Sequence, residues 1–274
     1  MRKGLYIALL LLALLSCSGN RERCDRRITV TIEPYRFLVE QIAGPEWEVT
    51  TILPKGADPE TSDFTARQIL SLADSRAYMF VGDFGVEKNW LHKVAAEHPA
   101  LLMFDTSSGV ERYNNDPHIW TSPDNMAQIA SNVCNVLCSM DSAGSNGYRE
   151  RLEAFRSMLQ VTDSLVKERL AARTDSTFII FHPSLTYFAR MYGLQQLAVE
   201  HEGKEPSAAQ MQRLIESVKE SATKTLFVQQ QFDDKHARVV ADAVGADIFT
   251  IDPLNYDWQG QMLYIADCLS RVQQ

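Results

Sequence analysis

Four side chains that could bind a metal ion occur in four different loops of the sequence: Glu60, His118, His182 and Asp252. Two of them, His182 and Asp252, directly follow predicted β-strands. Ligands of open α/β sheets bind beyond the carboxyl ends of the strands, where such loops meet. Two imidazoles and two carboxylates are suitable donors for a borderline divalent cation such as Zn²⁺, Mn²⁺ or Fe²⁺. The set is therefore a candidate transition-metal site.

Each of these residues also has an ordinary structural explanation. His118 and His182 stand beside prolines, where an isolated histidine often has only a packing role. Asp252 precedes a proline, and aspartate before proline is a common turn former. Spacing alone leaves both interpretations open: one metal site, or four unrelated loop residues.

The elements that must position these side chains alternate between strand and helix in both halves of the chain. Strands are predicted at 28–32, 49–53, 77–81 and 101–104, and again at 178–181, 197–199, 226–228 and 248–251. Helical patterns lie near 37–42, 66–73 and 90–96, and near 187–191, 211–218, 237–244 and 262–269. This alternation predicts an α/β fold of two lobes, each a mostly parallel sheet flanked by helices.

The longest helical pattern lies between the two halves. Its apolar positions recur at steps of three and four, and no glycine or proline occurs from Tyr148 to Arg173. We expect one amphipathic helix of about 25 residues, roughly 40 Å at 1.5 Å per residue, as a stiff bridge. The predicted organisation is a lobe at 28–141, a bridging segment at 142–173 and a lobe at 174–274.

The N-terminus predicts export. Two basic residues precede the apolar run from Leu5 to Leu15, which is too short to cross a bilayer as a permanent helix. Residues 1–16 therefore have the pattern of a signal peptide. Beyond this run, no apolar stretch approaches the roughly 20 residues that a spanning helix needs.

The end of the signal resembles the lipobox of bacterial lipoproteins. In that motif a small residue, here Ser16, precedes a cysteine, here Cys17, which is lipidated and becomes the first residue of the mature chain. An ordinary signal peptide with an incidental cysteine is the alternative. Residues 17–27 form a polar tether, and a lipid anchor contributes about 0.8 kcal/mol per buried methylene. The expectation is a cell-envelope protein, lipid-anchored to a bacterial membrane and facing the periplasm or the exterior.

Charge and composition narrow the partners. The 27 Lys and Arg face 35 Asp and Glu, and removing residues 1–16 takes away two basic and no acidic residues. The acidic balance argues against nucleic acid and fits a surface that collects cations, although plain solubility explains it equally well. The 45% hydrophobic content predicts a sizeable core.

The remaining cysteines do not indicate a second metal site. Cys134 and Cys138 are four residues apart on one predicted helix face, but no histidine or second cysteine pair accompanies them. Buried apolar side chains explain them, and Cys268, better than a redox or metal pair does. Cys24 falls in the tether.

Five segments occur in a characteristic order. Residues 116–123 read D-P-H-x-W-x-S-P, the most specific of the five. The others are P-x-G-x-D-P at 54–59, G-x-x-G-x-E with a later Trp at 82–90, F-H followed by Y-F and Y-G-L at 181–194, and D-P-L at 252–254. Together they resemble the metal-binding solute-binding proteins of zinc and manganese ABC importers (cluster A-I), a group with streptococcal lipoproteins once described as adhesins. The resemblance covers nearly all of the mature sequence and is closest to the zinc-binding members.

The resemblance implies a function and a ligand set. The family's four ligands come from these loops, which implies Glu60, His118, His182 and Asp252. The protein is then a monomeric binding component that delivers a divalent metal to an ABC permease and its ATPase. Two departures stand out: the family usually has histidine where Glu60 stands, and the short segment 104–115 lacks the histidine-rich loop of many zinc members.

Zinc is the expected metal. At the third ligand position, histidine accompanies zinc members and glutamate many manganese members, and this chain has His182. Glu60 hardens the site and favours Mn²⁺ or Fe²⁺ on donor type alone. The divalent series nevertheless places Zn²⁺ above Mn²⁺ at a mixed nitrogen–oxygen site. Manganese or iron remains the alternative.

Other functional classes fit the sequence less well. A metal-dependent hydrolase needs an open coordination position and a general base, whereas four ligands predict a closed site, and no H-E-x-x-H pattern, nucleophile elbow or glycine-rich phosphate loop occurs. A chelate-binding site would be lined by aromatic and arginine side chains. Nothing independent predicts an adhesin. Of the other histidines, His92, His98 and His236 are expected on the surface, and His201 in an exposed loop or as a peripheral metal contact.

Overall fold

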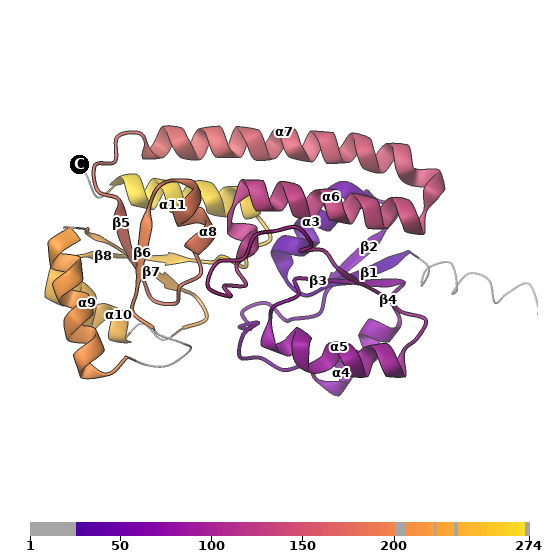
Figure 1. Cartoon of the computed structure of the whole chain (residues 1–274), viewed down its shortest axis with the longest axis horizontal. Helices are drawn as coiled ribbons and strands as arrows, with labels where there is room; N and C mark the ends of the chain where they lie inside the picture. The colour runs from indigo at the N-terminus through magenta and orange to yellow at the C-terminus, as the bar shows by residue number, and fades with distance from the viewer. Residues whose placement is uncertain (1–25, 201–205, 222, 233–234, 272–274) are drawn as a thin grey trace, which may run out of the picture.

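The structure, a computed structural model, describes residues 26–200, 206–221, 223–232 and 235–271. Two lobes lie side by side, each built on a four-stranded sheet (Figure 1). The first sheet contains β1 (Arg27–Val30), β2 (Glu48–Thr51), β3 (Ala77–Phe80) and β4 (Leu102–Asp105). The second contains β5 (Thr177–Ile180), β6 (Gln195–Ala198), β7 (Thr225–Gln229) and β8 (Asp247–Ile251). The predicted two-lobed α/β fold is confirmed.

Both sheets are wound in the same way. Their strand orders are β2-β1-β3-β4 and β6-β5-β7-β8, and all described pairings are parallel. The chain direction across each sheet therefore reverses beside the central strand, β1 or β5. Loops leave opposite faces of the sheet at that point, which opens a crevice at the carboxyl ends of the strands. His182 lies there, two residues beyond the end of β5.

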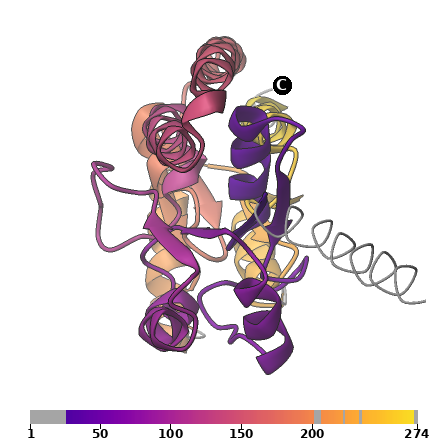
Figure 2. The same cartoon turned by 90° about the vertical axis from the view of Figure 1, so that its right-hand side faces the viewer.

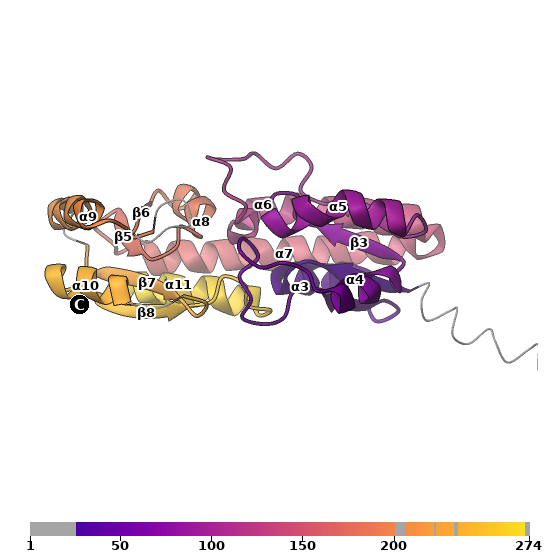
Figure 3. The ribbon, with the colours of Figure 1, turned by 90° about the horizontal axis from the view of Figure 1, so that it is seen from below.

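Helices cover both faces of each sheet. In the first lobe they are α3 (Glu33–Ala43), α4 (Ala66–Ala73), α5 (Gly85–Glu97) and α6 (Pro123–Met140). In the second they are α8 (Thr186–Met191), α9 (Ala208–Ser221), α10 (Lys235–Val244) and α11 (Trp258–Arg271). Seen from below, α4 and α5 lie across the first lobe, and α9 and α10 lie at the outer end of the second (Figure 3). No helix among the described residues is long and apolar enough to cross a bilayer.

Helix α7 (Ser145–Leu170) bridges the lobes and runs along the outer edge of the molecule (Figures 1 and 2). The predicted apolar stripe is its buried face: Tyr148, Leu152, Phe155, Leu159, Thr162 and Val166. The expected limits were displaced by three residues at both ends. At the start, a short 3₁₀ turn, Ser142–Gly144, leads directly into the helix. At the end, the Arg173 guanidinium donates hydrogen bonds to the carbonyl oxygens of Asp175, Thr177 and Leu269. Arg173 therefore lies outside the helix, which ends at Leu170.

The hydrophobic core falls into two clusters. The larger extends through the first lobe, α7 and the inner face of the second sheet, where it includes Phe178 and Ile180. The smaller lies between the second sheet and helices α9 and α10, and includes Ile179 and Phe181. Alternate residues of a strand point to opposite faces, which explains how neighbours on β5 join different clusters. Cys134 and Cys268 are buried in the larger cluster, as predicted, whereas Cys138 is only partly buried and packs against it.

Candidate metal centre

Three of the four predicted ligands converge between the lobes: Glu60, His118 and His182. Glu60 Oε1 lies 3.4 Å from His118 Nε2 and 3.3 Å from His182 Nε2. The centroids of the two imidazole rings are 5.2 Å apart, and their planes make an angle of 67°. One donor atom from each residue lies within 4.8 Å of the others. The loops after β2, β4 and β5 thus bring two nitrogens and one oxygen to a common point.

A second carboxylate orients each histidine. Asp116 Oδ1 lies 2.7 Å from His118 Nδ1, and Glu200 Oε2 lies 3.1 Å from His182 Nδ1. A carboxylate that accepts the Nδ1–H fixes the tautomer and leaves the Nε2 lone pair for a metal ion. Asp116 Oδ1 also accepts the backbone N–H of His118 at 2.8 Å, which fixes the main chain beside the ring.

Packing holds the His182 ring further. The ring of Phe232 stacks on it, with centroids 5.0 Å apart and an interplanar angle of 18°. The Gln229 side-chain amide donates hydrogen bonds to the His182 carbonyl and to the Ser184 hydroxyl. The stacking restricts the imidazole ring, and the Gln229 bonds hold the main chain that carries it, which preorganises the donor.

The charges of the cluster are coupled. Burial alone would lower the pKa of His182, but its hydrogen bonds to Glu200 and Glu60 outweigh this and raise the pKa to about 10. Burial raises the pKa of Glu60, but the hydrogen bond from His182 and the charges of both histidines lower it by more than burial raises it. The pKa of Glu60 is therefore below its usual value. In the metal-free protein, a proton on His182 therefore compensates the carboxylates. A divalent cation would replace that proton.

The cluster opens to solvent on one side. A cavity of about 740 Å³ leads to it and is lined by Asn114, Asn115, Gln196 and Ala198 as well as by the cluster. The Glu60 side chain, 32% exposed, faces this mouth, while the histidine side chains are only 8% and 9% exposed. Asn114 and Asn115 adopt left-handed backbone conformations, with φ of 52° and 57°, which asparagine tolerates better than most residues.

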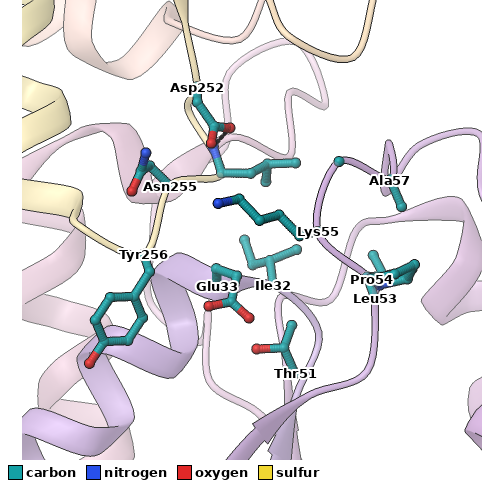
Figure 4. Close-up of a pocket in the computed structure, with 12 residues that line it drawn as sticks. Ile32, Glu33, Thr51, Leu53, Pro54, Lys55, Ala57, Asp252, Asn255 and Tyr256 are labelled. Atoms are coloured by element: carbon teal, nitrogen blue, oxygen red, sulfur yellow. Dashed lines mark hydrogen bonds between the residues drawn. The ribbon is translucent and has the colours of Figure 1, made fainter.

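Asp252, the fourth predicted ligand, lies outside the three-residue cluster. Its Oδ1 accepts hydrogen bonds from the Leu254 N–H at 3.2 Å and the Gln231 amide at 3.3 Å. It lines a neighbouring pocket with Lys55 and Asn255 (Figure 4). Its side chain is buried, as are those of the two histidines.

Sequence reasoning missed three supporting residues: Asp116, Glu200 and Phe232. Asp116 was visible within the D-P-H segment, where only the histidine was assigned a role. Glu200 follows β6 by two residues, the same relation to a strand that singled out His182, and β6 pairs with β5. His201, which was considered instead, lies outside the described residues, as do Cys17, Cys24 and the predicted signal peptide. No signal in the sequence distinguished Phe232.

Two parallel α/β lobes, one long bridging helix and an interlobe cluster of imidazoles and carboxylates define a metal-binding solute-binding protein. The sequence model of the family described as "ZnuA: Zinc-uptake complex component A periplasmic" matches residues 28–271. The chain therefore belongs to this family, a binding component of ABC metal importers and not an enzyme. The predicted family, function class and absence of catalysis are all confirmed by this membership.

Individual relatives are distant in sequence but similar in structure. ZnuA of Bacillus subtilis is 21% identical over 300 residues, covering 98% of this chain and 94% of that protein. The zinc-binding lipoprotein AdcA of Streptococcus pneumoniae is 22% identical over 91% of this chain, which spans only 54% of AdcA. The crystal structure of ZnuA is 32% identical with a TM-score of 0.86, covering 89% of this chain and 97% of that one. FpvC of Pseudomonas aeruginosa, solved with Mn²⁺, shares the fold at 22% identity and a TM-score of 0.78.

Proposed function

We propose that this protein captures Zn²⁺ at Glu60, His118 and His182 and delivers it to an ABC permease driven by its ATPase. The observation that supports this proposal is that the buried Nε2 atoms of His118 and His182 lie 3.4 and 3.3 Å from the same Glu60 oxygen. Each imidazole is held from behind by a carboxylate, the arrangement that metal-ligating histidines adopt in proteins. Such a site binds a bare cation from solution.

The donor set supports zinc over its alternatives. Two imidazoles and a carboxylate suit Zn²⁺, which binds more tightly than Mn²⁺ or Fe²⁺ to mixed nitrogen–oxygen sites. Relatives described as zinc-uptake or zinc-binding proteins point the same way. Manganese or iron is the second candidate, because Glu60 supplies an oxygen where the family usually has an imidazole.

Asp252 is proposed as the fourth ligand. It is buried near the cluster, and the next residue, Pro253, lines a pocket together with His118 and His182. Zinc would then be held by two nitrogens and two oxygens, a closed tetrahedral set if each carboxylate binds through one oxygen.

Metal analysis and titration test the site. Protein purified without added metal should contain one zinc per chain, and His118→Ala and His182→Ala should each weaken zinc binding more than about a hundredfold, beyond the usual effect of losing a supporting residue. His92→Ala, which changes an exposed histidine on α5, is the matched control. Affinities of the two site variants within about threefold of wild type would remove these histidines from the site.

Growth distinguishes the metals, which competition in vitro cannot do because zinc should win in either case. A strain that lacks this protein should recover when zinc is added to a metal-depleted medium. Recovery with manganese alone would contradict the assignment of zinc.

We also propose a domain organisation and a lipid anchor for the protein. Residues 1–16 are the signal peptide, Cys17 carries the lipid and 17–27 tether a monomer whose parts are 28–141, 142–173 and 174–274. The tether separates anchor from site, so Cys17→Ser should release the protein from the membrane fraction and leave zinc binding unchanged. A variant that still sediments with membranes would contradict the anchor.

A further inference from the structure

The segment that carries His118 belongs to the first lobe by sequence but contacts the second lobe extensively. Trp120 Nε1 donates to the Pro253 carbonyl at 2.8 Å, and Trp258 Nε1 donates to the Trp120 carbonyl at 2.8 Å. The Arg190 guanidinium lies 3.4 Å from the centroid of the Tyr113 ring. The position of His118 is therefore set by contacts with both lobes.

The Tyr187 hydroxyl connects the chain segments that carry the two histidines. Tyr187 Oη donates a hydrogen bond to the Asp116 carbonyl at 2.8 Å and accepts one from the Tyr113 N–H at 3.3 Å. Tyr187 is in the first turn of α8, five residues after His182. Asp116 holds the His118 ring through its carboxylate. Tyr187 thus links the segment that follows His182 to Asp116, the residue whose carboxylate orients His118.

We propose that Tyr187 is a positioning residue that sets the distance between the His118 and His182 nitrogens at the metal site. The inference rests on the proposed function and deepens it. Metal–ligand distances are defined within about 0.2 Å, and a site loosened by as little as 1 Å loses its preorganisation. Because the two imidazoles come from different lobes, a bond between the lobes close to the rings keeps their separation constant. Tyr187 is only 3% exposed, so water does not compete for its hydroxyl.

The chain provides a matched control in Tyr148. It is 2% exposed, and its hydroxyl likewise makes one accepted and one donated bond, from Trp47 Nε1 at 2.9 Å and to Asp141 Oδ2 at 2.8 Å. Both partners lie in the first lobe, Trp47 just before β2 and Asp141 just after α6, outside the loops that carry the cluster. Tyr187→Phe and Tyr148→Phe therefore remove equivalent groups, one beside the metal site and one away from it.

The test measures zinc affinity by chelator competition, the visible absorption of bound Co²⁺, and unfolding of the metal-free proteins. Tyr187→Phe should weaken zinc binding about tenfold, the lower end of the effect of supporting residues, and shift the Co²⁺ bands because the ligand geometry changes. Tyr148→Phe should stay within about threefold, with wild-type bands. Both should lower the unfolding midpoint of the metal-free protein to a similar extent.

Two results would overturn the inference: a Tyr187→Phe variant with wild-type affinity and Co²⁺ bands, or equal losses of affinity in both variants, which would indicate general destabilisation. Wild-type protein and His182→Ala, assayed in parallel, separate this failure from that of the proposed function. If the wild type binds no zinc, or His182→Ala binds as well as wild type, the proposed function and the role of Tyr187 are both refuted. If those two behave as expected and Tyr187→Phe matches Tyr148→Phe, only the role of Tyr187 is refuted.

Discussion

The two sheets have the same strand order but are packed differently. In the first lobe, helices on both faces of the sheet contribute to the larger core, for example Leu38 of α3 and Leu72 of α4. In the second lobe only the inner face joins that core, through Ile180 and Leu269 among others. Its outer face forms the separate, smaller cluster with α9 and α10. The second lobe is thus divided between a core shared with the rest of the molecule and a core of its own.

The two core clusters support different parts of the metal site. Ile119 and Trp120, which follow His118, are fully buried in the shared core. Phe181, which precedes His182, belongs to the smaller cluster, and Phe232, which stacks on His182, packs against it. The residues beside His118 are therefore buried in the core that joins both lobes, whereas His182 lies beside the smaller cluster. Four predictions test this contrast.

The largest effect is expected from truncating the two cores. Ile179 and Ile180 are adjacent on β5, both fully buried, and point to the smaller and the shared cluster respectively. Replacing either with alanine should cost about 2–5 kcal/mol of unfolding free energy. Ile180→Ala should be near the upper end, because the larger core relaxes less around a cavity. Urea denaturation measures both, and equal costs would argue that the clusters are not distinct in stability.

Next in size are the carboxylates behind the imidazoles. Asp116→Asn and Glu200→Gln should each weaken zinc binding, within about 10–100-fold. Asp116→Asn should have the larger effect, because Asp116 makes the shorter contact and also holds the His118 backbone. The exposed Glu97 on α5, changed to glutamine, is the control for lost charge. Calorimetric titration would contradict this ranking if Glu200→Gln were clearly the weaker binder.

A pH dependence distinguishes His182. Its pKa of about 10 means that it is protonated in the metal-free protein at pH 7, and zinc binds only neutral imidazole. Zinc binding should therefore release this proton, and affinity should rise with pH up to about 10. Because the folded pKa exceeds the unfolded value of about 6.5, the metal-free fold should also lose this contribution to stability as pH rises from about 6.5 to about 10.

Calorimetry in buffers of different ionisation enthalpy counts the protons that zinc releases. Glu200→Gln should lower the count at pH 7, because it removes the carboxylate that accepts the His182 Nδ1–H and thereby raises the pKa of His182. A pH-independent affinity with no proton release would refute a protonated His182.

The smallest effect is expected in overall shape. The shared core and helix α7 join the lobes, so loading with zinc should shift local loops and change the radius of gyration very little. Small-angle scattering of metal-free and loaded protein provides the measurement. A large closure on binding would show that the shared core does not hold the lobes together as a unit.

The sequence by itself determined the elements and the loops that matter. Apolar periodicity located the eight strands of the described residues and the bridging helix, because a strand or helix repeats its buried face over short, local distances. Strand ends and motif order selected Glu60, His118 and His182, which the structure brings together. The limits of α7 differ from the predicted ones, because its start and end depend on a 3₁₀ turn and on the side-chain bonds of Arg173.

Only the tertiary structure decided which loops meet and what supports them. Asp252 lies outside the cluster although its strand-end position matched that of His182, and Glu200 reaches His182 because β6 pairs with β5. The Tyr187 bond to the His118 segment joins residues 71 positions apart. These long-range contacts depend on how the two lobes pack around a shared core, which is stabilised by many weak contacts. No local pattern in the chain encodes them.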